Sequence, residues 1–292
     1  MDLKAFVNYS KEAWERISLR GKEPKLPITS LVHLNRKMWG IPEAKLTVIG
    51  ARTSNCKTAF AMQLMTDILN TGKSVLYLGF EMKQDELMER MFCAKYRIDN
   101  IELMTGYSGD YEKEWQEFTS YLNKLRFVAA DQFGKTWEGL QEFVSSLETV
   151  PDVIVIDYIQ AISQGSGDGK RFIDEYLLNF RNMCINTGFA GIVVSQLNRQ
   201  SQDRTDKSPQ LHDLKGSGYL EEIADLVLLL DWVGKAENSR EFEINIAKNR
   251  RGLTGWVKCE YIGKHYLFQD MPPEVAGLQD DANQLHMDTN VS

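Results

Sequence analysis

The stretch Lys45–Asn70, KLTVIGARTSNCKTAFAMQLMTDILN, limits what this chain can fold into more than any other. Its apolar run Leu46–Ile49 is typical of a buried strand. After Thr58, apolar residues recur at the three-to-four spacing of a helix with one buried face, and Asn70–Gly72 supplies the stop. A strand, a loop ending in Lys-Thr and a helix together have the layout of a phosphate-binding P-loop.

The loop between this strand and this helix carries the chemistry of the motif. Backbone N–H groups and the N-terminus of the helix hold phosphate oxygens. Lys57 is expected to reach the β- and γ-phosphates, and the hydroxyl of Thr58 is expected to take Mg²⁺. The predicted nucleotide-binding residues are Ala51, Arg52, Thr53, Ser54, Asn55, Cys56, Lys57 and Thr58.

One residue departs from the P-loop pattern, because Cys56 occupies the position that usually holds Gly before the Lys. Gly accepts backbone angles that cost other residues about 1 kcal/mol, and it lets the backbone approach the phosphates. We expect the Cys56 side chain to crowd the nucleotide, or its thiol to act as a redox brake with a pKa lowered by the helix N-terminus. The alternatives are a loop that tolerates a small side chain here, and an ordinary strand–helix turn with a chance Lys-Thr.

Two further strand patterns end in acids. Lys73–Phe80 is followed by Glu81, and in Pro151–Asp157 four consecutive β-branched residues precede the Asp. Because ligands bind at the carboxyl edge of open α/β sheets, Glu81 is a candidate base and Asp157 a candidate Mg²⁺ carboxylate. The alternative for Glu81 is an acid that caps the helix predicted at Gln84–Arg97.

The remaining periodic segments predict one α/β domain, with a mostly parallel sheet flanked by helices and an antiparallel hairpin near the C-terminus. Ile28–Trp39 is predicted to be a helix capped by Thr29 or Ser30. Two more helices are predicted at Trp137–Leu147 and Phe172–Asn186. The other predicted strands are Leu125–Ala129, Gly191–Ser195, Ala224–Asp231, Phe242–Lys248 and Thr254–Tyr261.

Three segments are predicted along the chain. They are an N-terminal arm at residues 1–26, the α/β domain at residues 27–270 and an acidic, disordered tail at residues 271–292. Within the arm, Ala5–Leu19 is predicted to be an amphipathic helix. That helix either packs on its own domain or docks on a neighbouring subunit.

Composition excludes several classes of function. No apolar run approaches the length of a membrane span, and the N-terminus lacks the apolar region of a secretory leader, so no membrane partner is expected. The cysteines form no CxxC pair and indicate free thiols in a reducing compartment, the cytoplasm. The scattered histidines predict no zinc site. A net charge of −7 argues against a surface that coats nucleic acid, but it is compatible with a few DNA-binding loops that line a channel.

Six blocks between about Pro27 and Phe268 occur in an order that resembles a known family. They are VIGARTSNCKTAFA, YLGFEM, VIVIDYIQ, VVSQLNRQ, DLKGSGYLEEIADLVLLL and IAKNRRGLTG. With these blocks the chain resembles the C-terminal motor domain of the DnaB family of replicative helicases, which has a RecA-like fold. The resemblance implies a RecA-like P-loop ATPase core that uses ATP and Mg²⁺, moves 5′ to 3′ on single-stranded DNA and unwinds duplex DNA.

The resemblance also implies roles for individual residues. Glu81 resembles the base that orients the attacking water, and Asp157 resembles the carboxylate beside Mg²⁺. Gln196 resembles the residue that senses the γ-phosphate and couples the site to the DNA loops. Lys248 and Arg250 resemble the pair that a subunit inserts into its neighbour's site, with Arg250 as the arginine finger. The residues on the loop that grips the DNA backbone in this family are Lys215, Gly216 and Gly218.

Partners and departures follow from the same resemblance. It implies that the protein binds single-stranded DNA, assembles with itself into a hexameric ring, and interacts with a primase or a helicase loader. The implied location is the cytoplasm or, for a phage protein, the cytoplasm of the host. Ala5–Leu19 resembles the linker helix that docks on the adjacent subunit. Gly216 departs from the family, which commonly has Glu there, and the family's N-terminal collar domain has no counterpart in these residues.

Three hypotheses remain open. The first is an ATP-driven helicase motor. The second is a hydrolysis-impaired, RecA-like helper subunit that binds nucleotide or DNA, which Cys56 favours. The third is another RecA-like ATPase, such as a recombinase or a clock-type protein, and the blocks SQLNR and KNRRG argue against it. A strand-displacement assay with ATP separates the first two.

Overall fold

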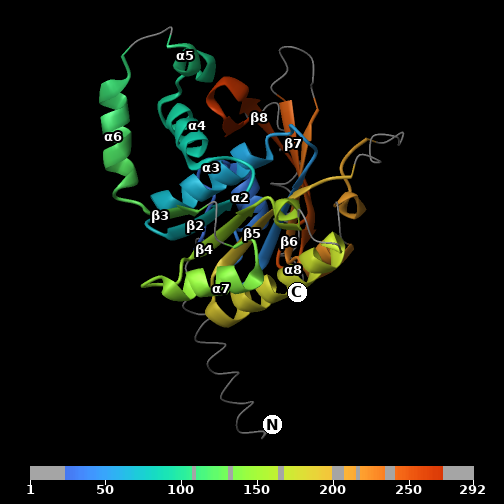
Figure 1. Ribbon diagram of the computed structural model, residues 1–292. Coiled ribbons are helices and arrows are strands. Elements are labelled where there is room, and N and C mark those ends of the chain that lie inside the picture. The colour runs from blue at the N-terminus through green and yellow to red at the C-terminus, as the bar shows by residue number, and fades with distance from the viewer. Residues whose placement is uncertain are drawn as a thin grey trace, which may run out of the picture.

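One sheet holds all the strands of the described residues, and their bounds are β1 (Leu46–Ala51), β2 (Ser74–Gly79), β3 (Arg126–Ala130), β4 (Val153–Asp157), β5 (Ala190–Gln196), β6 (Leu226–Trp232), β7 (Glu241–Asn249), β8 (Gly255–Ile262) and β9 (Leu267–Asp270). Their order is β3-β2-β4-β5-β1-β6-β7-β8-β9 (Figure 1). The computed structural model describes residues 24–106, 110–130, 134–163, 168–198, 207–214, 218–233 and 241–271. Strands β1 to β6 run parallel, and β7, β8 and β9 continue the sheet antiparallel. The predicted α/β sheet with an antiparallel hairpin near the C-terminus is confirmed.

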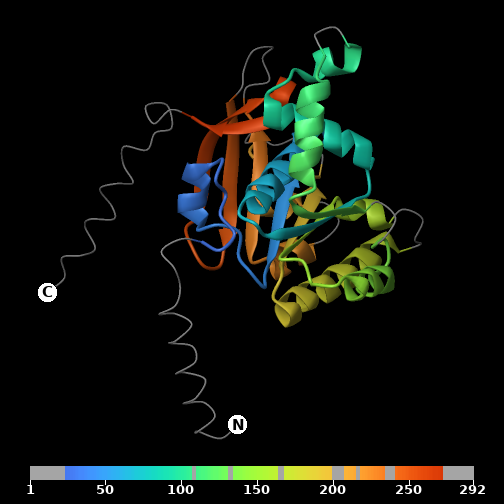
Figure 2. The ribbon, with the colours of Figure 1, turned by 90° about the vertical axis from the view of Figure 1, so that its left-hand side faces the viewer.

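Helices cover both faces of the sheet (Figure 2). One face carries α2 (Val32–Met38), α3 (Lys57–Asn70), α4 (Gln84–Tyr96) and α6 (Glu112–Leu122). The opposite face carries α7 (Trp137–Ser146), α8 (Gly169–Thr187) and α9 (Gly218–Ile223). The short elements are α5 (Asn100–Thr105) and the 3₁₀ helices η1 (Ile159–Ser163), η3 (Leu211–Asp213) and η4 (Gly263–His265).

The side chains of each parallel strand alternate between two hydrophobic cores, one on each face. In β4, Val153 and Val155 belong to the core on the α3 face, and Ile154 and Ile156 belong to the core on the α8 face. All four are fully buried. A parallel strand with helices on both faces needs apolar residues on both sides, which is why this segment is a continuous apolar run.

Sequence reasoning missed α5, α6 and β9. Trp115, Phe118 and Leu122 stand at helical spacing, which is the signal for α6. In the structure the rings of Trp115 and Phe118 lie 4.9 Å and 5.5 Å from the ring of Phe92 on α4, so aromatic contacts hold α6 to the domain. Strand β9 has only four residues, too few for a period-two pattern to stand out.

The predicted caps of the first helix are wrong. Helix α2 begins at Val32, and its first N–H groups bond to Asp270 at the end of β9, with a Val32 N to Asp270 Oδ2 distance of 2.7 Å. The Thr29 and Ser30 hydroxyls instead donate to the buried carboxylate of Asp67 on α3, at 3.0 Å and 2.6 Å. Burial raises the pKa of Asp67, and these hydrogen bonds oppose the shift. A distant acid therefore caps α2, and the local hydroxyls fasten the chain before α2 to α3.

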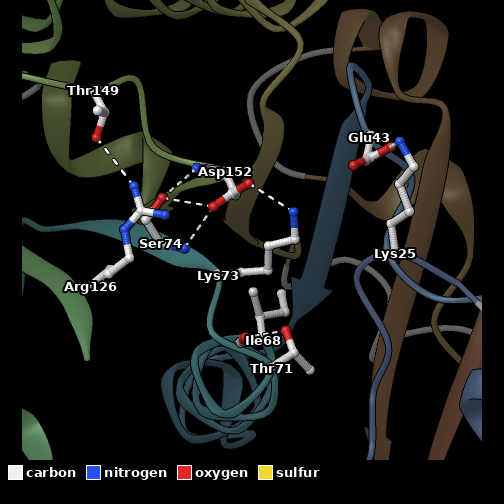
Figure 3. Close-up of polar contacts among 9 residues, drawn as sticks. All are labelled: Lys25, Glu43, Ile68, Thr71, Lys73, Ser74, Arg126, Thr149 and Asp152. Atoms are coloured by element: carbon white, nitrogen blue, oxygen red, sulfur yellow. Dashed lines mark hydrogen bonds and ion pairs between the residues drawn. The ribbon is translucent and has the colours of Figure 1, made fainter. Parts of the chain in front are cut away.

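Asp152 ties the beginnings of β2 and β4 together (Figure 3). Its Oδ2 atom accepts from the backbone N and from the Oγ of Ser74, both at 2.8 Å, and its Oδ1 lies 3.1 Å from Nζ of Lys73. The backbone N of Asp152 donates back to Ser74 Oγ at 2.9 Å. This contact aligns the two neighbouring strands whose carboxyl ends lead to Glu81 and Asp157.

Several predictions fall outside the described residues. They are the Ala5–Leu19 helix, the acidic tail from residue 272 onward, and the loop residues Lys215 and Gly216. The boundaries of the arm, the domain and the tail stay predictions. Across the described ranges, no helix combines the length and the apolar character that crossing a membrane requires.

Candidate active site

The P-loop lies at the carboxyl edge of the parallel strands, between the end of β1 at Ala51 and the start of α3 at Lys57. Ser54 and Cys56 have positive φ angles of 63° and 55°, so the loop turns through the left-handed region twice. Among the described residues, no side chain caps the first N–H groups of α3. A helix N-terminus with free N–H groups favours an anion such as phosphate.

Lys57 and Glu81 meet at this edge. The Nζ atom of Lys57 lies 3.4 Å from Oε2 of Glu81 and 4.9 Å from the centre of the Tyr158 ring. The side chain of Lys57 is 12% exposed and that of Glu81 is 56% exposed, so the carboxylate faces solvent while the ammonium is enclosed. Glu81 does not cap α4, because the N-cap residue is Lys83, so the capping alternative is wrong.

Asp157 ends β4 beside them and is only 2% exposed. Its Oδ2 atom accepts a hydrogen bond of 2.9 Å from the hydroxyl of Tyr77. Burial raises its pKa, and the hydrogen bond from Thr58, the charge of Lys57 and the Tyr77 hydroxyl oppose that shift. Within the described residues, its Oδ1 atom is buried without a hydrogen-bond partner.

A buried carboxylate oxygen without a partner, next to a Thr hydroxyl, fits a Mg²⁺ site. Among the described residues, no group of three or more His, Cys, Asp or Glu side chains could hold a metal ion alone. Mg²⁺ in nucleotide sites needs no such group, because it is held by one or two protein oxygens, phosphate oxygens and water. Thr58 and Asp157 are therefore a suitable protein contribution.

Gln196 also reaches the P-loop. It is the last residue of β5, which pairs with β1 so that Gln196 stands opposite Ala51. Its side-chain amide donates to the hydroxyl of Thr53, and the backbone N of Leu197 donates to the carbonyl of Ala51 at 2.9 Å. The structure thus brings together the predicted residues Lys57, Thr58, Glu81, Asp157 and Gln196, from the ends of neighbouring strands.

Arg52 uses its side chain to anchor the loop. One guanidinium nitrogen lies 3.0 Å from the carboxylate of Asp231 near the end of β6, and another donates to the carbonyl of Lys207. Both partners of the ion pair are largely buried. Sequence reasoning placed Arg52 in the phosphate loop but missed Asp231. It also missed Tyr77 in β2 and Tyr158 just after β4, since aromatic residues in or beside a strand read as core.

The thiol of Cys56 faces the protein interior. It packs against the core on the α3 face and forms a hydrogen bond with Tyr261 of β8. Burial raises the pKa of the Cys56 thiol to about 11, so the predicted lowering by the helix N-terminus is wrong. Desolvation outweighs the helix N-terminus because the sulfur lies in an apolar environment.

Lys248 and Arg250 lie at the opposite edge of the sheet. Lys248 pairs with Val227 near the beginning of β6, whereas the P-loop follows the carboxyl end of β1. Nζ of Lys248 donates to the carbonyl of Glu221 at 2.6 Å, and Arg250 donates to the carbonyl of Glu222 at 3.0 Å. Both side chains thus bind the last turn of α9. A β-strand rises about 3.3 Å per residue. Lys248 and Arg250 are therefore separated from the P-loop of their own chain by the full length of β6.

Of the predicted DNA-loop residues Lys215, Gly216 and Gly218, the described residues include Gly218. It is the exposed first residue of α9. Lys248 and Arg250 therefore contact the carboxyl end of the helix that begins at Gly218.

Comparison with known proteins gives the family. The profile of the family described as "DnaB-like helicase C terminal domain" matches residues 28–270. The "Replicative DNA helicase DnaC" of Bacillus subtilis (strain 168) is 30% identical over 257 residues, which are 83% of this chain and 56% of the relative. The "Replicative DNA helicase DnaB" of Pasteurella multocida (strain Pm70) is 30% identical over 263 residues, with coverages of 85% and 56%. The chain thus spans about half the length of these relatives.

Two solved structures share the fold. The "ATPase Domain of G40P" superposes with a TM-score of 0.80 at 22% identity, over 93% of this chain and 100% of that one. A DnaB-like replicative helicase, solved in a study of its interactions with primase, superposes with a TM-score of 0.79 at 22% identity, over 89% of this chain and 67% of that one. With a profile match over most of its length and the RecA-like fold of these ATPase domains, the chain belongs to the DnaB-like helicase C-terminal domain family.

Proposed function

We propose that this chain is the ATP-hydrolysing motor of a replicative DNA helicase, which moves 5′ to 3′ along single-stranded DNA and unwinds the duplex. The placement of two groups of residues carries the proposal. Lys57, Glu81 and Asp157 lie together at the carboxyl edge of the sheet, and Lys248 and Arg250 lie at the opposite edge. Because one chain cannot bring both groups to one phosphate, their separation supports a site that is built by two subunits, as in a ring.

In this proposal each residue has a defined part. Lys57 and the first N–H groups of α3 bind the phosphates of ATP, and Thr58 and Asp157 hold Mg²⁺. The bound Mg²⁺ neutralises charge on the phosphates. Glu81 accepts a proton from the attacking water and orients it. Arg250 of the neighbouring subunit stabilises the charge that develops on the phosphoryl group.

The proposal extends to the assembly. Residues 27–270 are the motor, the arm at residues 1–26 docks on the adjacent subunit of a hexamer, and residues 271–292 form a tail. The loop with Lys215, Gly216 and Gly218 grips the DNA backbone. A primase or a helicase loader is the proposed protein partner, because the primase interaction of the solved DnaB-like helicase supports such a contact.

A strand-displacement assay tests this function. The substrates are two partial duplexes, one with a 5′ single-stranded tail and one with a 3′ single-stranded tail. Each is incubated with the protein, ATP and Mg²⁺. We expect unwinding that depends on ATP and on the 5′ tail, and no unwinding by Lys57→Ala. ATP turnover without unwinding of either substrate would contradict the helicase assignment.

A second candidate is a hydrolysis-impaired helper subunit. The supporting observation is the left-handed backbone at Cys56, with a φ of 55°, where the P-loop pattern has Gly. This candidate predicts that the wild type binds ATP but does not turn it over with or without DNA. Turnover stimulated by single-stranded DNA excludes it.

A further inference from the structure

The side chain of Gln160 bridges two consecutive residues at the end of β5. It projects from η1, three positions after Asp157. Its Oε1 atom accepts from the backbone N of Gln196 at 3.1 Å, and its Nε2 atom donates to Oγ of Ser195 at 2.9 Å. The backbone N–H of Gln196 is a fixed donor, so it must face the amide oxygen, and this sets the orientation of the Gln160 amide.

This bridge holds Gln196, the last residue of β5, whose side chain touches the P-loop. The Gln196 side chain donates to the Thr53 hydroxyl, while its main chain is held from behind by Gln160. Ser195 is fully buried, so its hydroxyl has a fixed position. A continuous set of contacts therefore joins Thr53 through Gln196 to Gln160 on η1.

A second connection starts from the same place. The backbone N of Asn198 donates to the carbonyl of Asp213 at 2.7 Å, and Leu197 forms an isolated antiparallel bridge with Leu214. Asp213 is buried, and its carboxylate accepts from the backbone N of Gln210 at 2.8 Å. The segment Gln210–Leu214 leads directly into residue 215, the start of the proposed DNA loop.

We propose that Gln160 is a positioning residue that links the nucleotide loop to both segments. It fixes Gln196 between Thr53 and η1, so that η1 and the Gln210–Leu214 segment respond together to the nucleotide. This inference rests on the proposed function, since it assigns the coupling between ATP and DNA to a residue that contacts neither. A merely structural role for Gln160 predicts a loss of stability and no specific loss of coupling.

The coupling can be measured as a ratio of affinities. The dissociation constant of a fluorescent oligo(dT) is determined by anisotropy with and without a slowly hydrolysed ATP analogue, for the full chain. Coupling between two sites typically changes affinity by about 5- to 150-fold. For the wild type we expect a ratio in this range, and for Gln160→Leu a ratio within about twofold of one. Global destabilisation lowers both affinities alike and leaves the ratio unchanged.

Three further variants make the test specific. Gln160→Glu keeps the acceptor for Gln196 but cannot donate to Ser195, whose hydroxyl would have to leave the carbonyl of Gln196 to donate in its place. Ser195→Ala removes the bond from Gln160, so both variants should give intermediate ratios. They also serve if Gln160→Leu does not fold. Gln141→Leu, on the exposed side of α7, is the matched control and should keep the wild-type ratio.

The outcomes separate this inference from the function on which it rests. A wild-type ratio in Gln160→Glu and Ser195→Ala, or in a folded Gln160→Leu, overturns the positioning role while the motor function stands. A wild type that unwinds no duplex and binds no oligo(dT) overturns the proposed function, and the inference falls with it. A ratio that is lowered in the Gln160 and Ser195 variants but not in Gln141→Leu supports the inference.

Discussion

The ammonium of Lys57 and the carboxylate of Glu81 are 3.4 Å apart, within reach of an ion pair. In the proposed mechanism these two groups have different partners, since Lys57 binds phosphate and Glu81 binds water. Phosphate oxygens compete with Glu81 for Lys57, so nucleotide binding also releases the carboxylate for its catalytic task. The exposed position of Glu81 leaves it free to turn towards water.

Glu81→Gln should separate binding from turnover. The amide keeps the shape and hydrogen-bonding capacity of the side chain but lacks the charge that orients water. We expect ATP affinity within a few-fold of the wild type and a turnover rate lower by roughly 10²–10⁴, the range for loss of a general base. Equilibrium binding of a fluorescent ATP analogue and DNA-stimulated phosphate release measure the two quantities.

Glu86→Gln is the control for this prediction. Glu86 is the neighbouring carboxylate on α4, where it pairs with Arg90 at 2.5 Å. Its variant should turn over ATP at nearly the wild-type rate. Normal turnover by Glu81→Gln would place the base elsewhere, with Asp157 as the next candidate.

The contact between Cys56 and Tyr261 should appear in a double-mutant cycle. Cys56→Gly relieves a left-handed backbone that costs about 1 kcal/mol, but it also removes the thiol that bonds to Tyr261. Tyr261→Phe removes the same hydrogen bond from the other side. We expect a coupling free energy of about 1 kcal/mol in urea unfolding. Additive effects of the two substitutions would rule out this bond.

The same contact makes a prediction about reactivity and turnover. With a thiol pKa of about 11, Cys56 holds little thiolate at neutral pH. Mass spectrometry should show that iodoacetamide modifies Cys56 roughly 100-fold more slowly than a free cysteine of ordinary pKa. Because the sulfur packs into the core, we expect Cys56→Gly to turn over ATP within a few-fold of the wild type. Rapid alkylation would support the redox hypothesis, and a large gain in turnover would support the crowding hypothesis.

Local patterns were sufficient to predict the nucleotide loop and the strands around it. The P-loop, the β-branched run before Asp157 and the strand before Glu81 each have a signal within a few residues. Since carboxyl ends of parallel strands share one edge, these patterns also placed Lys57, Glu81 and Asp157 in one site.

Contacts between distant segments could not be predicted in this way. Arg52 and Asp231 are 179 residues apart, and Val32 and its cap Asp270 are 238 residues apart. The pKa of Cys56 was predicted in the wrong direction because its main determinant is burial beside Tyr261, which a local argument about the helix N-terminus does not include. Pairings of this kind depend on the strand order of the finished sheet.

Asp152 should make the domain sensitive to acid. It is partly buried, which opposes ionisation, but hydrogen bonds from Ser74 and Lys73 outweigh this and lower its pKa. A carboxyl group with a lowered pKa stabilises the fold above its unfolded-state pKa of about 3.9, and this stabilisation is lost as the pH falls through the folded pKa. Asp152→Asn should therefore lower the free energy of unfolding at pH 7 and differ less from the wild type below about pH 3.

Urea unfolding at a series of pH values measures this difference. Glu148→Gln, an exposed neighbour of the same strand start, is the control and should show no such trend. A destabilisation by Asp152→Asn that stays constant between pH 7 and strong acid would show that shape, and not charge, is what Asp152 contributes.

Mixing two inactive variants tests whether a site is shared between subunits. Lys57→Ala lacks the phosphate lysine and Arg250→Ala lacks the finger, so each alone should have no turnover. In randomly mixed rings, about a quarter of the interfaces carry both intact residues, so DNA-stimulated turnover should partly recover. Arg250 also binds the carbonyl of Glu222 and pairs with the buried carboxylate of Asp225 at 3.6 Å, so its loss should loosen this edge of the sheet without reaching the P-loop. Arg251→Ala, in the same turn, is the control and should stay active. Full activity of Arg250→Ala alone would remove it from the site, and no recovery on mixing would contradict a site shared between subunits.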